Sequence, residues 1–286
     1  MIINAKTQLI GLLGWPISHS LSPQIQNAAA QDLGLNWVYV PMPVRPEHIA
    51  TAVAGLAALG FRGVNVTVPH KQAVMPHLDE ITEGAQAVGA VNTIKVGPSG
   101  HLTGYNTDWS GFMADLVALG IDVNGRDCIV LGAGGSARAI AFGLARAGAQ
   151  VQVLARQLDQ AIDLVADLVP FIDDAALMAR PLQALKAVST STKEPLIINT
   201  TPVGMLNSPD ISIWPEDLPF PMGAFVYDLI YNPPATRFLR QAKAAGVPAQ
   251  NGLALLLRQG AESFEIWTGQ TPDLAVMENA IRGGTA

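Results

Sequence analysis

The stretch Cys128-Ile-Val-Leu-Gly132-Ala133-Gly134-Gly135-Ser136-Ala137-Arg138 decides the expected fold of this 286-residue chain. Its apolar beginning predicts a buried strand, its glycines predict a tight turn, and the small residues after them open a helix. The spacing matches Gly-x-Gly-x-x-Gly/Ala, with Ala137 in the last place. Another apolar run, Gln150 to Leu154, follows where a second parallel strand is expected. The pattern therefore predicts a βαβ unit of the dinucleotide-binding type.

Such a turn suits a pyrophosphate for simple physical reasons. The first glycine permits the sharp turn, the second lets the backbone approach the ligand, and the small last residue lets helix and strand pack closely. The helix N-terminus adds free N–H groups and the positive end of its dipole. We expect the dinucleotide to be bound by the residues of this turn: Gly132, Ala133, Gly134, Gly135, Ser136 and Ala137.

The end of the second strand bears on which dinucleotide is bound. An NAD-specific unit usually carries Asp or Glu there, to bond the ribose 2′-hydroxyl. This chain has Ala155-Arg156-Gln157 instead. A guanidinium attracts a 2′-phosphate and can bond it through two N–H groups, so Arg156 favours NADP. Asp159 lies nearby in the sequence and leaves the use of NAD open.

Strand and helix signals alternate along the whole chain, which predicts an α/β fold with a largely parallel sheet. Ser22 is expected as the N-cap of a first helix and Pro23 as its first residue. Another helix is expected from about Ser110 to Leu119, and the stretch 157–194 looks helical and has no assignable chemistry. The last helices, from about Asn251, no longer alternate with strands. We predict two domains: residues 1–107 together with 251–286, and an inserted Rossmann domain of residues 108–250.

Composition excludes several classes of protein. The net charge is −6, which disfavours nucleic acid and anionic membranes as partners. No apolar run approaches the roughly 20 residues that a transmembrane helix needs, and the N-terminus does not resemble a signal peptide. The single cysteine, Cys128, sits in an apolar run and is expected to be structural. These features predict a cytoplasmic protein.

Polar residues gather at four places outside the nucleotide-binding unit. Strand ends in open α/β sheets are where ligands bind, and hydroxyls beside a helix N-terminus suit a carboxylate. Each residue also has a plainer interpretation: Ser22 as a helix cap, Lys71 as a solvated lysine and Asp108 as an N-terminal helix residue. The four clusters contain Ser20 and Ser22; Asn65, Thr67 and Lys71; Asn92; and Asp108.

Taken together, these clusters resemble the shikimate dehydrogenase family. The shared motifs are Ser20-Leu-Ser22-Pro, Asn65-Val-Thr67-Val-Pro-His-Lys71, Gly89-Ala-Val-Asn92-Thr, Asn106-Thr-Asp108-Trp-Ser-Gly, the glycine turn, Asn199-Thr-Thr201-Pro-Val-Gly-Met205, Asp228-Leu-Ile-Tyr231-Asn-Pro, and Asn251-Gly252-Leu with Gln259. They occur in family order and span residues 14 to 259.

The resemblance implies a role for each matching residue. It implies an N-terminal substrate-binding domain and NADP-dependent, reversible reduction of 3-dehydroshikimate to shikimate, in aromatic amino-acid biosynthesis. Lys71 and Asp108 would be the catalytic pair. The substrate would be held by Ser20, Ser22, Asn65, Thr67, Asn92, Asp108, Tyr231 and Gln259. Thr201, Met205 and Gly252 would join the glycine turn and Arg156 in binding the cofactor.

The chain departs from the family pattern in three places. Of the usual Asn-Arg-Thr clamp for the 2′-phosphate only Arg156 is kept. Gln26 replaces a common histidine, and Leu255 stands where methionine is frequent. The first departure bears on the choice between NADP and NAD. The other two concern groups that neither proton transfer nor hydride transfer needs.

Other functions are left open by the sequence. A quinate/shikimate dehydrogenase that accepts NAD would share the fold, and room near Ser20 and Ser22 would decide, because quinate carries an extra hydroxyl beside its carboxylate. A non-catalytic NADP-binding sensor should have lost Lys71 or Asp108. No metal site is expected, since the histidines show no ligand spacing. We expect a monomer or homodimer, with hinges near 107–110 and 250–252.

Overall fold

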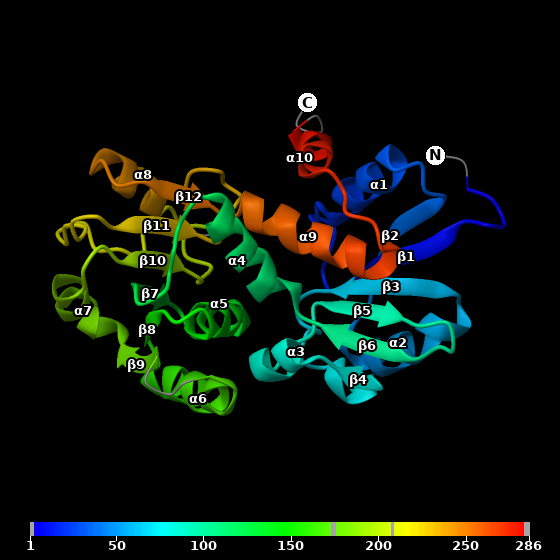
Figure 1. Ribbon diagram of the computed structural model, residues 1–286, viewed down its shortest axis with the longest axis horizontal. Helices are drawn as coiled ribbons and strands as arrows, with labels where there is room; N and C mark the ends of the chain where they lie inside the picture. Colours follow the sequence, from blue (N-terminus) through cyan, green and yellow to red (C-terminus); the bar gives the residue numbers. More distant parts are fainter. Residues whose placement is uncertain (1–2, 173–175, 207–208, 283–286) are drawn as a thin grey trace. The chain divides into compact units, whose positions relative to one another are not determined.

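The computed structural model describes residues 3–172, 176–206 and 209–282. The chain forms two compact units (Figure 1). The first unit is Met1–Thr107 with Leu257–Ala286, and the second unit is Asp108–Leu256. None of the helices in the described part of the chain is long and apolar enough to cross a bilayer.

The first unit is built on a mixed six-stranded sheet of order β2-β1-β3-β5-β6-β4. The parallel part is β2 (Trp37–Pro43), β1 (Gln8–Gly14) and β3 (Phe61–Val66). β5 (Thr93–Val96) runs antiparallel to β3 and to β6 (Leu102–Tyr105), and the short β4 (Glu80–Ile81) pairs in parallel with β6. Three of the five strand pairs are therefore parallel, as the α/β pattern predicts, and β5 is the antiparallel exception. The connection of residues 97–101 is too short for a parallel crossover, so β5 and β6 form a hairpin.

The helices of the first unit cover this sheet. They are α1 (Ser22–Asp32), α2 (Ile49–Ala58), α3 (Glu83–Val88), most of α9 (Leu253–Thr268) and α10 (Leu274–Arg282), with short 3-10 turns at Pro46–His48 and Met75–His77. α10 packs against α1, as Figure 1 shows. The N-cap of α1 is Leu21, so the prediction that Ser22 caps the helix is wrong: Ser22 is its first residue and Pro23 its second.

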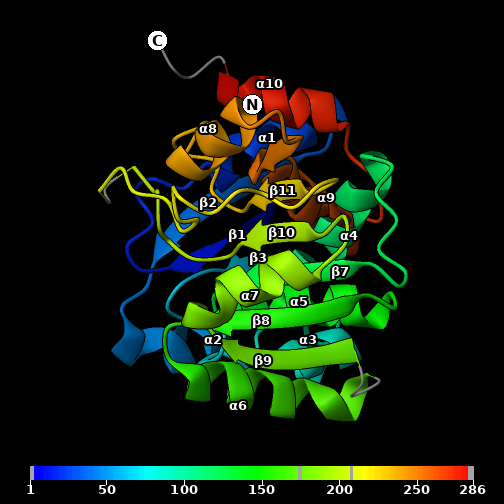
Figure 2. The same cartoon turned by 90° about the vertical axis from the view of Figure 1, so that its left-hand side faces the viewer.

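The second unit contains a parallel six-stranded sheet of order β12-β11-β10-β7-β8-β9. Figure 2 shows the strands from β11 to β9 in this order. Its strands are β7 (Asp127–Leu131), β8 (Gln150–Ala155), β9 (Leu177–Pro181), β10 (Leu196–Asn199), β11 (Phe225–Asp228) and β12 (Ala249–Asn251). Numbered along the chain, this is the order 6-5-4-1-2-3 of the Rossmann fold. The four central strands β8, β7, β10 and β11 are mostly apolar and buried, because the middle of a parallel sheet is covered on both faces, whereas the edge strands β9 and β12 are more exposed.

Helices α4 (Thr107–Ala118), α5 (Gly135–Arg146), α6 (Leu158–Leu168), α7 (Leu185–Ser191) and α8 (Arg237–Ala244) complete the second unit, with 3-10 turns at Val169–Phe171 and Leu182–Ala184. α4 begins three residues earlier than expected, so Asp108 lies inside its first turn. The expectation that 157–194 is helical is wrong in part, since β9 lies within it.

The single cysteine, Cys128, is buried in β7. Burial raises the pKa of its thiol to about 12, which favours a structural role.

Candidate active site

The strands of the first unit bring most of the predicted substrate residues to one edge of the sheet. Leu13 pairs with Val66, so the carboxyl ends of β1 and β3 lie side by side. Because β5 runs antiparallel to β3, its first residue Thr93 pairs with Asn65, and it also pairs with Tyr105 at the end of β6. Four segments that are distant in the sequence thus meet at one edge.

Backbone hydrogen bonds hold the loops at this edge together. The N–H of Thr67 donates to the carbonyl of Leu13 over 2.9 Å, and the N–H of Trp15 donates to the carbonyl of Val68 over 3.1 Å. The N–H of Val91 donates to the carbonyl of Lys71 over 2.8 Å. The loop that leads to the two serines therefore lies beside the loop that carries Thr67 and Lys71.

Asn65 lies at the centre of a buried hydrogen-bond network. Its Oδ1 accepts from the hydroxyl of Tyr39 at 2.9 Å. Its Nδ2 has acceptors in the Asn92 carbonyl at 3.2 Å, Thr93 Oγ1 at 3.1 Å and Ser263 Oγ at 2.9 Å. An amide nitrogen carries two hydrogens, so the donors of Asn65 are used within the network. Oδ1 keeps one lone pair that can accept a further hydrogen bond.

Asn92 is tied to the start of α4. Its Nδ2 donates to Thr107 Oγ1 at 3.0 Å, and its Oδ1 accepts from the Thr107 N–H at 2.8 Å. The Thr93 hydroxyl adds a bond of 3.0 Å to the same Oδ1. Buried amides of this kind are costly unless satisfied, and here the partners fix the orientation of the side chain.

The two serines lie at the entrance of α1. Ser20 Oγ accepts from the N–H of Ser22 at 3.3 Å, and both residues are half-buried. Burial raises the pKa of Tyr39 above its usual range, while a hydrogen bond with Ser22 opposes that rise. Ser22 is therefore connected through Tyr39 to Asn65. The hydroxyls and the helix N-terminus together suit a carboxylate.

The remaining predicted residues of this site are placed as follows. Lys71 is half-buried just beyond β3, and Gln259 is half-buried on α9. Asp108 is the second residue of α4, directly after Thr107. Their roles toward a substrate stay predictions.

The glycine turn of the second unit has the backbone that nucleotide binding requires. Gly132 has a φ of +118°, and a Cβ there would lie 2.6 Å from Thr200 Oγ1. Gly134 precedes α5 as its N-cap, and neither it nor Gly135 would bring a Cβ within 4 Å of other atoms. Ala137 is fully buried and packs the helix onto the sheet. The backbone at the N-terminus of α5 is thus open to an approaching phosphate.

The turn lies at the point where the strand order of the sheet reverses. β7 has β8 on one side and β10 on the other, and the loop after β10 carries Thr200 and Thr201. Ligands of open α/β sheets bind at such switch points, at the carboxyl ends of the strands. Arg156 is exposed and follows β8 at this same end, where its guanidinium is available to a phosphate.

A second buried network joins the loops after β10 and β11. Asp228 accepts from Asn199 Nδ2 at 2.9 Å, from the Ile230 N–H at 3.2 Å and from the Thr236 hydroxyl at 2.6 Å. Asn199 Oδ1 in turn accepts from the N–H of Thr201 at 3.0 Å and from its hydroxyl at 2.7 Å. The network fixes the loop that carries Thr201 relative to β11.

Three further predicted residues lie near these loops. Met205 is exposed in the loop after β10, and Tyr231 is half-buried just after β11. Burial raises the pKa of Tyr231 above its ordinary value. Gly252 lies so close to the loop after β11 that a Cβ at this position would be 1.9 Å from the carbonyl oxygen of Leu229. Close packing therefore requires glycine at position 252, whether or not this residue also lies beside the cofactor as predicted.

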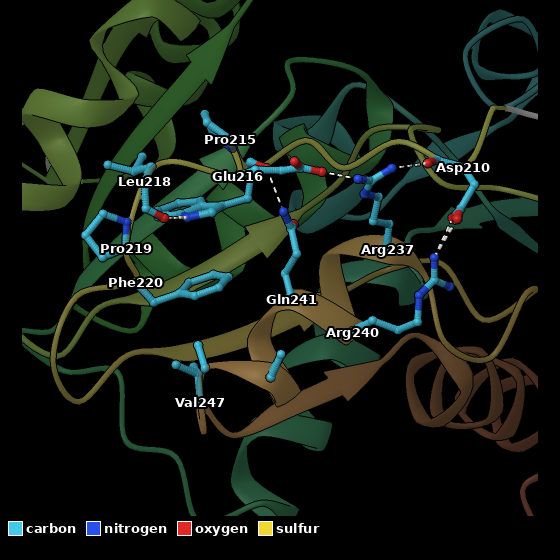
Figure 3. Close-up of a pocket in the computed structure, with 13 residues that line it drawn as sticks. Asp210, Pro215, Glu216, Leu218, Pro219, Phe220, Arg237, Arg240, Gln241 and Val247 are labelled. Atoms are coloured by element: carbon cyan, nitrogen blue, oxygen red, sulfur yellow. Dashed lines mark hydrogen bonds and ion pairs between the residues drawn. The ribbon is translucent and has the colours of Figure 1, made fainter.

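A surface hollow of the second unit lies elsewhere and contains none of the predicted site residues (Figure 3). Its wall includes the buried Trp214, which stacks on Phe220 at a centroid distance of 4.9 Å. Its arginines are paired: Arg237 with Glu216, and Arg240 with Asp210 at 2.6 Å. Both guanidinium groups of the hollow are thus already bonded to carboxylates.

Sequence reasoning missed several residues that hold these sites. In the first unit they are the hydroxyl residues Tyr39, Thr93, Thr107 and Ser263. In the second unit Asn199, Asp228 and Thr236 were given no role. One signal was available for Ser263, since a serine among Gly260, Phe264 and Trp267 occupies the apolar face of a helix.

The fold and the glycine turn define an α/β protein of two domains, one of them a Rossmann-type nucleotide-binding domain. The family model "Shikimate dehydrogenase substrate binding domain" matches residues 12–94, and "Shikimate 5'-dehydrogenase C-terminal domain" matches residues 252–282. The curated shikimate dehydrogenase (NADP(+)) of Citrifermentans bemidjiense is 45% identical over 98% of this chain and 97% of its own.

Solved structures are similar over almost the whole chain. Shikimate 5-dehydrogenase from Thermus thermophilus, in complex with NADP(H) and shikimate, is 40% identical with a TM-score of 0.85, covering 96% of this chain and 99% of its own. Quinate dehydrogenase from Corynebacterium glutamicum, in complex with NAD, is 29% identical with a TM-score of 0.90, covering 97% and 99%. The chain belongs to the shikimate dehydrogenase family, and the predicted fold class is confirmed.

Proposed function

We propose that this protein is an NADP-dependent oxidoreductase that interconverts 3-dehydroshikimate and shikimate. The observation that carries the proposal is the convergence of Ser20, Asn65, Thr67, Lys71 and Asn92 at one sheet edge of the first unit. Curated relatives at 45% identity are named shikimate dehydrogenase (NADP(+)). A triol acid needs a carboxylate site and several donors and acceptors, and this edge carries both.

The glycine turn and the N-terminus of α5 fit a dinucleotide, because Gly134 and Gly135 leave the backbone open and Gly132 takes the required turn. Gly132 to Ala137 would hold the pyrophosphate and Arg156 the 2′-phosphate. Thr201, Met205 and Gly252 would lie toward the nicotinamide. A bound nicotinamide supplies the hydride for ketone reduction and accepts it in the reverse direction.

The chain's own residues orient the substrate and handle the proton. Ser20 and Ser22 would receive the carboxylate, with Tyr231 as a further donor. Asn65, Thr67, Asn92 and Gln259 would bond the ring hydroxyls. The Lys71 ammonium would give its proton to the carbonyl oxygen as reduction proceeds, and its charge would stabilise the oxygen that forms. Asp108 would orient the lysine and bond the neighbouring hydroxyl.

Substitution of Lys71 tests this assignment. Lys71→Ala should lower turnover of shikimate with NADP+ by about 10²- to 10⁴-fold, the usual size of general acid–base catalysis. Its affinity for NADP+, measured by calorimetry, should stay unchanged. The control is Lys95→Ala, which removes an exposed lysine from β5 of the same unit. Turnover of Lys71→Ala equal to that of the control would overturn the assignment.

A second function, oxidation of quinate with NAD, is supported by the likeness to the quinate dehydrogenase of Corynebacterium glutamicum. Ala155 and Gln157 stand where the family pattern has the asparagine and threonine of the 2′-phosphate clamp, and this loss also favours the use of NAD. Activity on quinate would share all the catalytic steps, so only a comparison of substrates and cofactors separates the two proposals.

A further inference from the structure

We propose that Ser263, on α9, is a positioning residue that fixes the substrate-facing amide of Asn65; the inference rests on the proposed function. Ser263 is completely buried. Its hydroxyl is the point where groups from four segments meet: Asn65 on β3, Thr93 on β5, Thr107 at the start of α4, and its own helix.

The bonds of Ser263 use the full capacity of a hydroxyl. Its Oγ donates to the carbonyl of Gln259, one turn earlier in the helix, at 2.9 Å. Two lone pairs remain. One accepts from Asn65 Nδ2 at 2.9 Å. The hydroxyls of Thr93, at 2.8 Å, and Thr107, at 3.2 Å, are alternative donors to the other, because each has one hydrogen and each also lies within hydrogen-bond distance of Asn92 Oδ1.

These bonds decide which way the Asn65 amide faces. The acceptors around Nδ2 hold the nitrogen inside the unit, and Tyr39 donates to the oxygen. The free lone pair of Oδ1 is then the only hydrogen-bonding capacity that Asn65 offers to a ligand hydroxyl. Without the Ser263 oxygen, one amide hydrogen loses its shortest partner, and the amide is less firmly held.

The place of Ser263 in its helix supports this role. Serine is a poorer helix former than alanine, and a bond back to the carbonyl one turn earlier does not stabilise a helix. The neighbouring residues on the buried face, Phe264 and Trp267, are large and apolar. Alanine would fit the helix at least as well, so the network is what requires the hydroxyl.

The experiment compares Ser263→Ala with Thr268→Val. Thr268 makes the same kind of bond to the carbonyl one turn earlier, Phe264, at 2.8 Å on the same helix, and its other hydrogen bonds are with the backbone of Gln270. Ser263→Ala should raise the dissociation constant and KM for shikimate about tenfold, the value of one buried hydrogen bond. NADP+ affinity should stay the same. Thr268→Val should change neither constant.

The variants test the role of Ser263, and binding of shikimate by the wild-type protein tests the proposed function. Loss of thermal stability in both variants with an unchanged KM for shikimate would mean that Ser263 is only structural, and would overturn the inference. Should Ser263→Ala not fold, Ser263→Cys keeps a weak hydrogen-bonding atom and should give a smaller rise in KM. A wild-type protein that does not bind shikimate would instead contradict the proposed function.

Discussion

The hydroxyl of Tyr39, on β2, donates a hydrogen bond of 2.9 Å to Oδ1 of Asn65, on β3, although β1 lies between these two strands. Tyr39 also has a hydrogen bond with Ser22 on α1. The tyrosine thus joins the predicted carboxylate site to the predicted hydroxyl site. Tyr39 belongs to none of the recognised motifs, yet it connects the motif of Ser22 with the motif of Asn65.

Tyr39→Phe tests this connection. The variant removes the donor and leaves the buried Asn65 oxygen short of a partner, so the free energy of unfolding should fall by about 1–3 kcal/mol. KM for shikimate should rise, while KM for NADP+ should not. Urea denaturation and steady-state kinetics measure these effects. Tyr105→Phe, which alters a half-buried tyrosine of β6, is the control; equal effects of the two variants would contradict a special role for Tyr39.

Arg156→Ala should weaken NADP+ binding and leave NAD+ binding nearly unchanged. The guanidinium is exposed at the carboxyl end of β8, and a charge-assisted hydrogen bond contributes about 1.5–3 kcal/mol, which corresponds to about 10- to 150-fold in KM for NADP+. Arg126→Ala is the matched control, since Arg126 precedes β7 at the opposite end of the sheet. An equal loss for both cofactors would show that Arg156 does not read the 2′-phosphate.

Gly252→Ala should severely destabilise the protein. A Cβ at this position would lie 1.9 Å from the Leu229 carbonyl oxygen and 2.5 Å from its carbon, so the backbone must move. The expected loss is on the order of 3 kcal/mol or more, as for other severe overlaps in a packed interior. Thermal unfolding measures it. Gly55→Ala, inside α2 and with no contact closer than 3.7 Å, should be stabilising by about 0.5–1 kcal/mol.

Asp228 makes stability depend on pH. Burial raises its pKa from 3.8 to about 6, although three hydrogen bonds lower it. Between these values the folded state holds a proton that the unfolded state has released, so the free energy of unfolding falls as pH rises from about 4 to about 6. The contribution is on the order of 1–3 kcal/mol.

Denaturation with urea across this pH range measures the effect in wild type and in Asp228→Asn. The other titrating groups are common to both proteins, so the difference between their profiles isolates Asp228. The variant should lose less stability than wild type as pH rises through the range. Parallel profiles would contradict the raised pKa.

Much of the second unit could be predicted from its sequence, because a Rossmann strand, turn and helix are local features. Cys128 to Ala137 fold as expected from neighbouring residues alone. The unexpected β9 lies at the edge of the sheet, where Leu177 to Pro181 carries Arg180 and little apolar alternation. An edge strand is paired on one side only, so its sequence is less constrained.

In the first unit the motif residues could be predicted from the sequence, but the residues that support them could not. The motif residues Asn65, Thr67, Lys71 and Asn92 were recognised, and the strand register places them at one edge. Their supports were not recognised, because Tyr39 and Ser263 are far away in the sequence and reach Asn65 only after the sheet and α9 have packed. The pairing of such polar partners depends on tertiary structure, which propensity does not encode.

The most direct test of the account is the formation of reduced nicotinamide with four pairings: shikimate or quinate, each with NADP+ or NAD+. We predict that kcat/KM is highest for shikimate with NADP+, and that replacing either component lowers it by at least about tenfold, the value of one lost hydrogen bond or charge contact. Comparable values with quinate or NAD+ would place the protein among the broader quinate/shikimate dehydrogenases. Absence of activity in all four pairings would contradict the account.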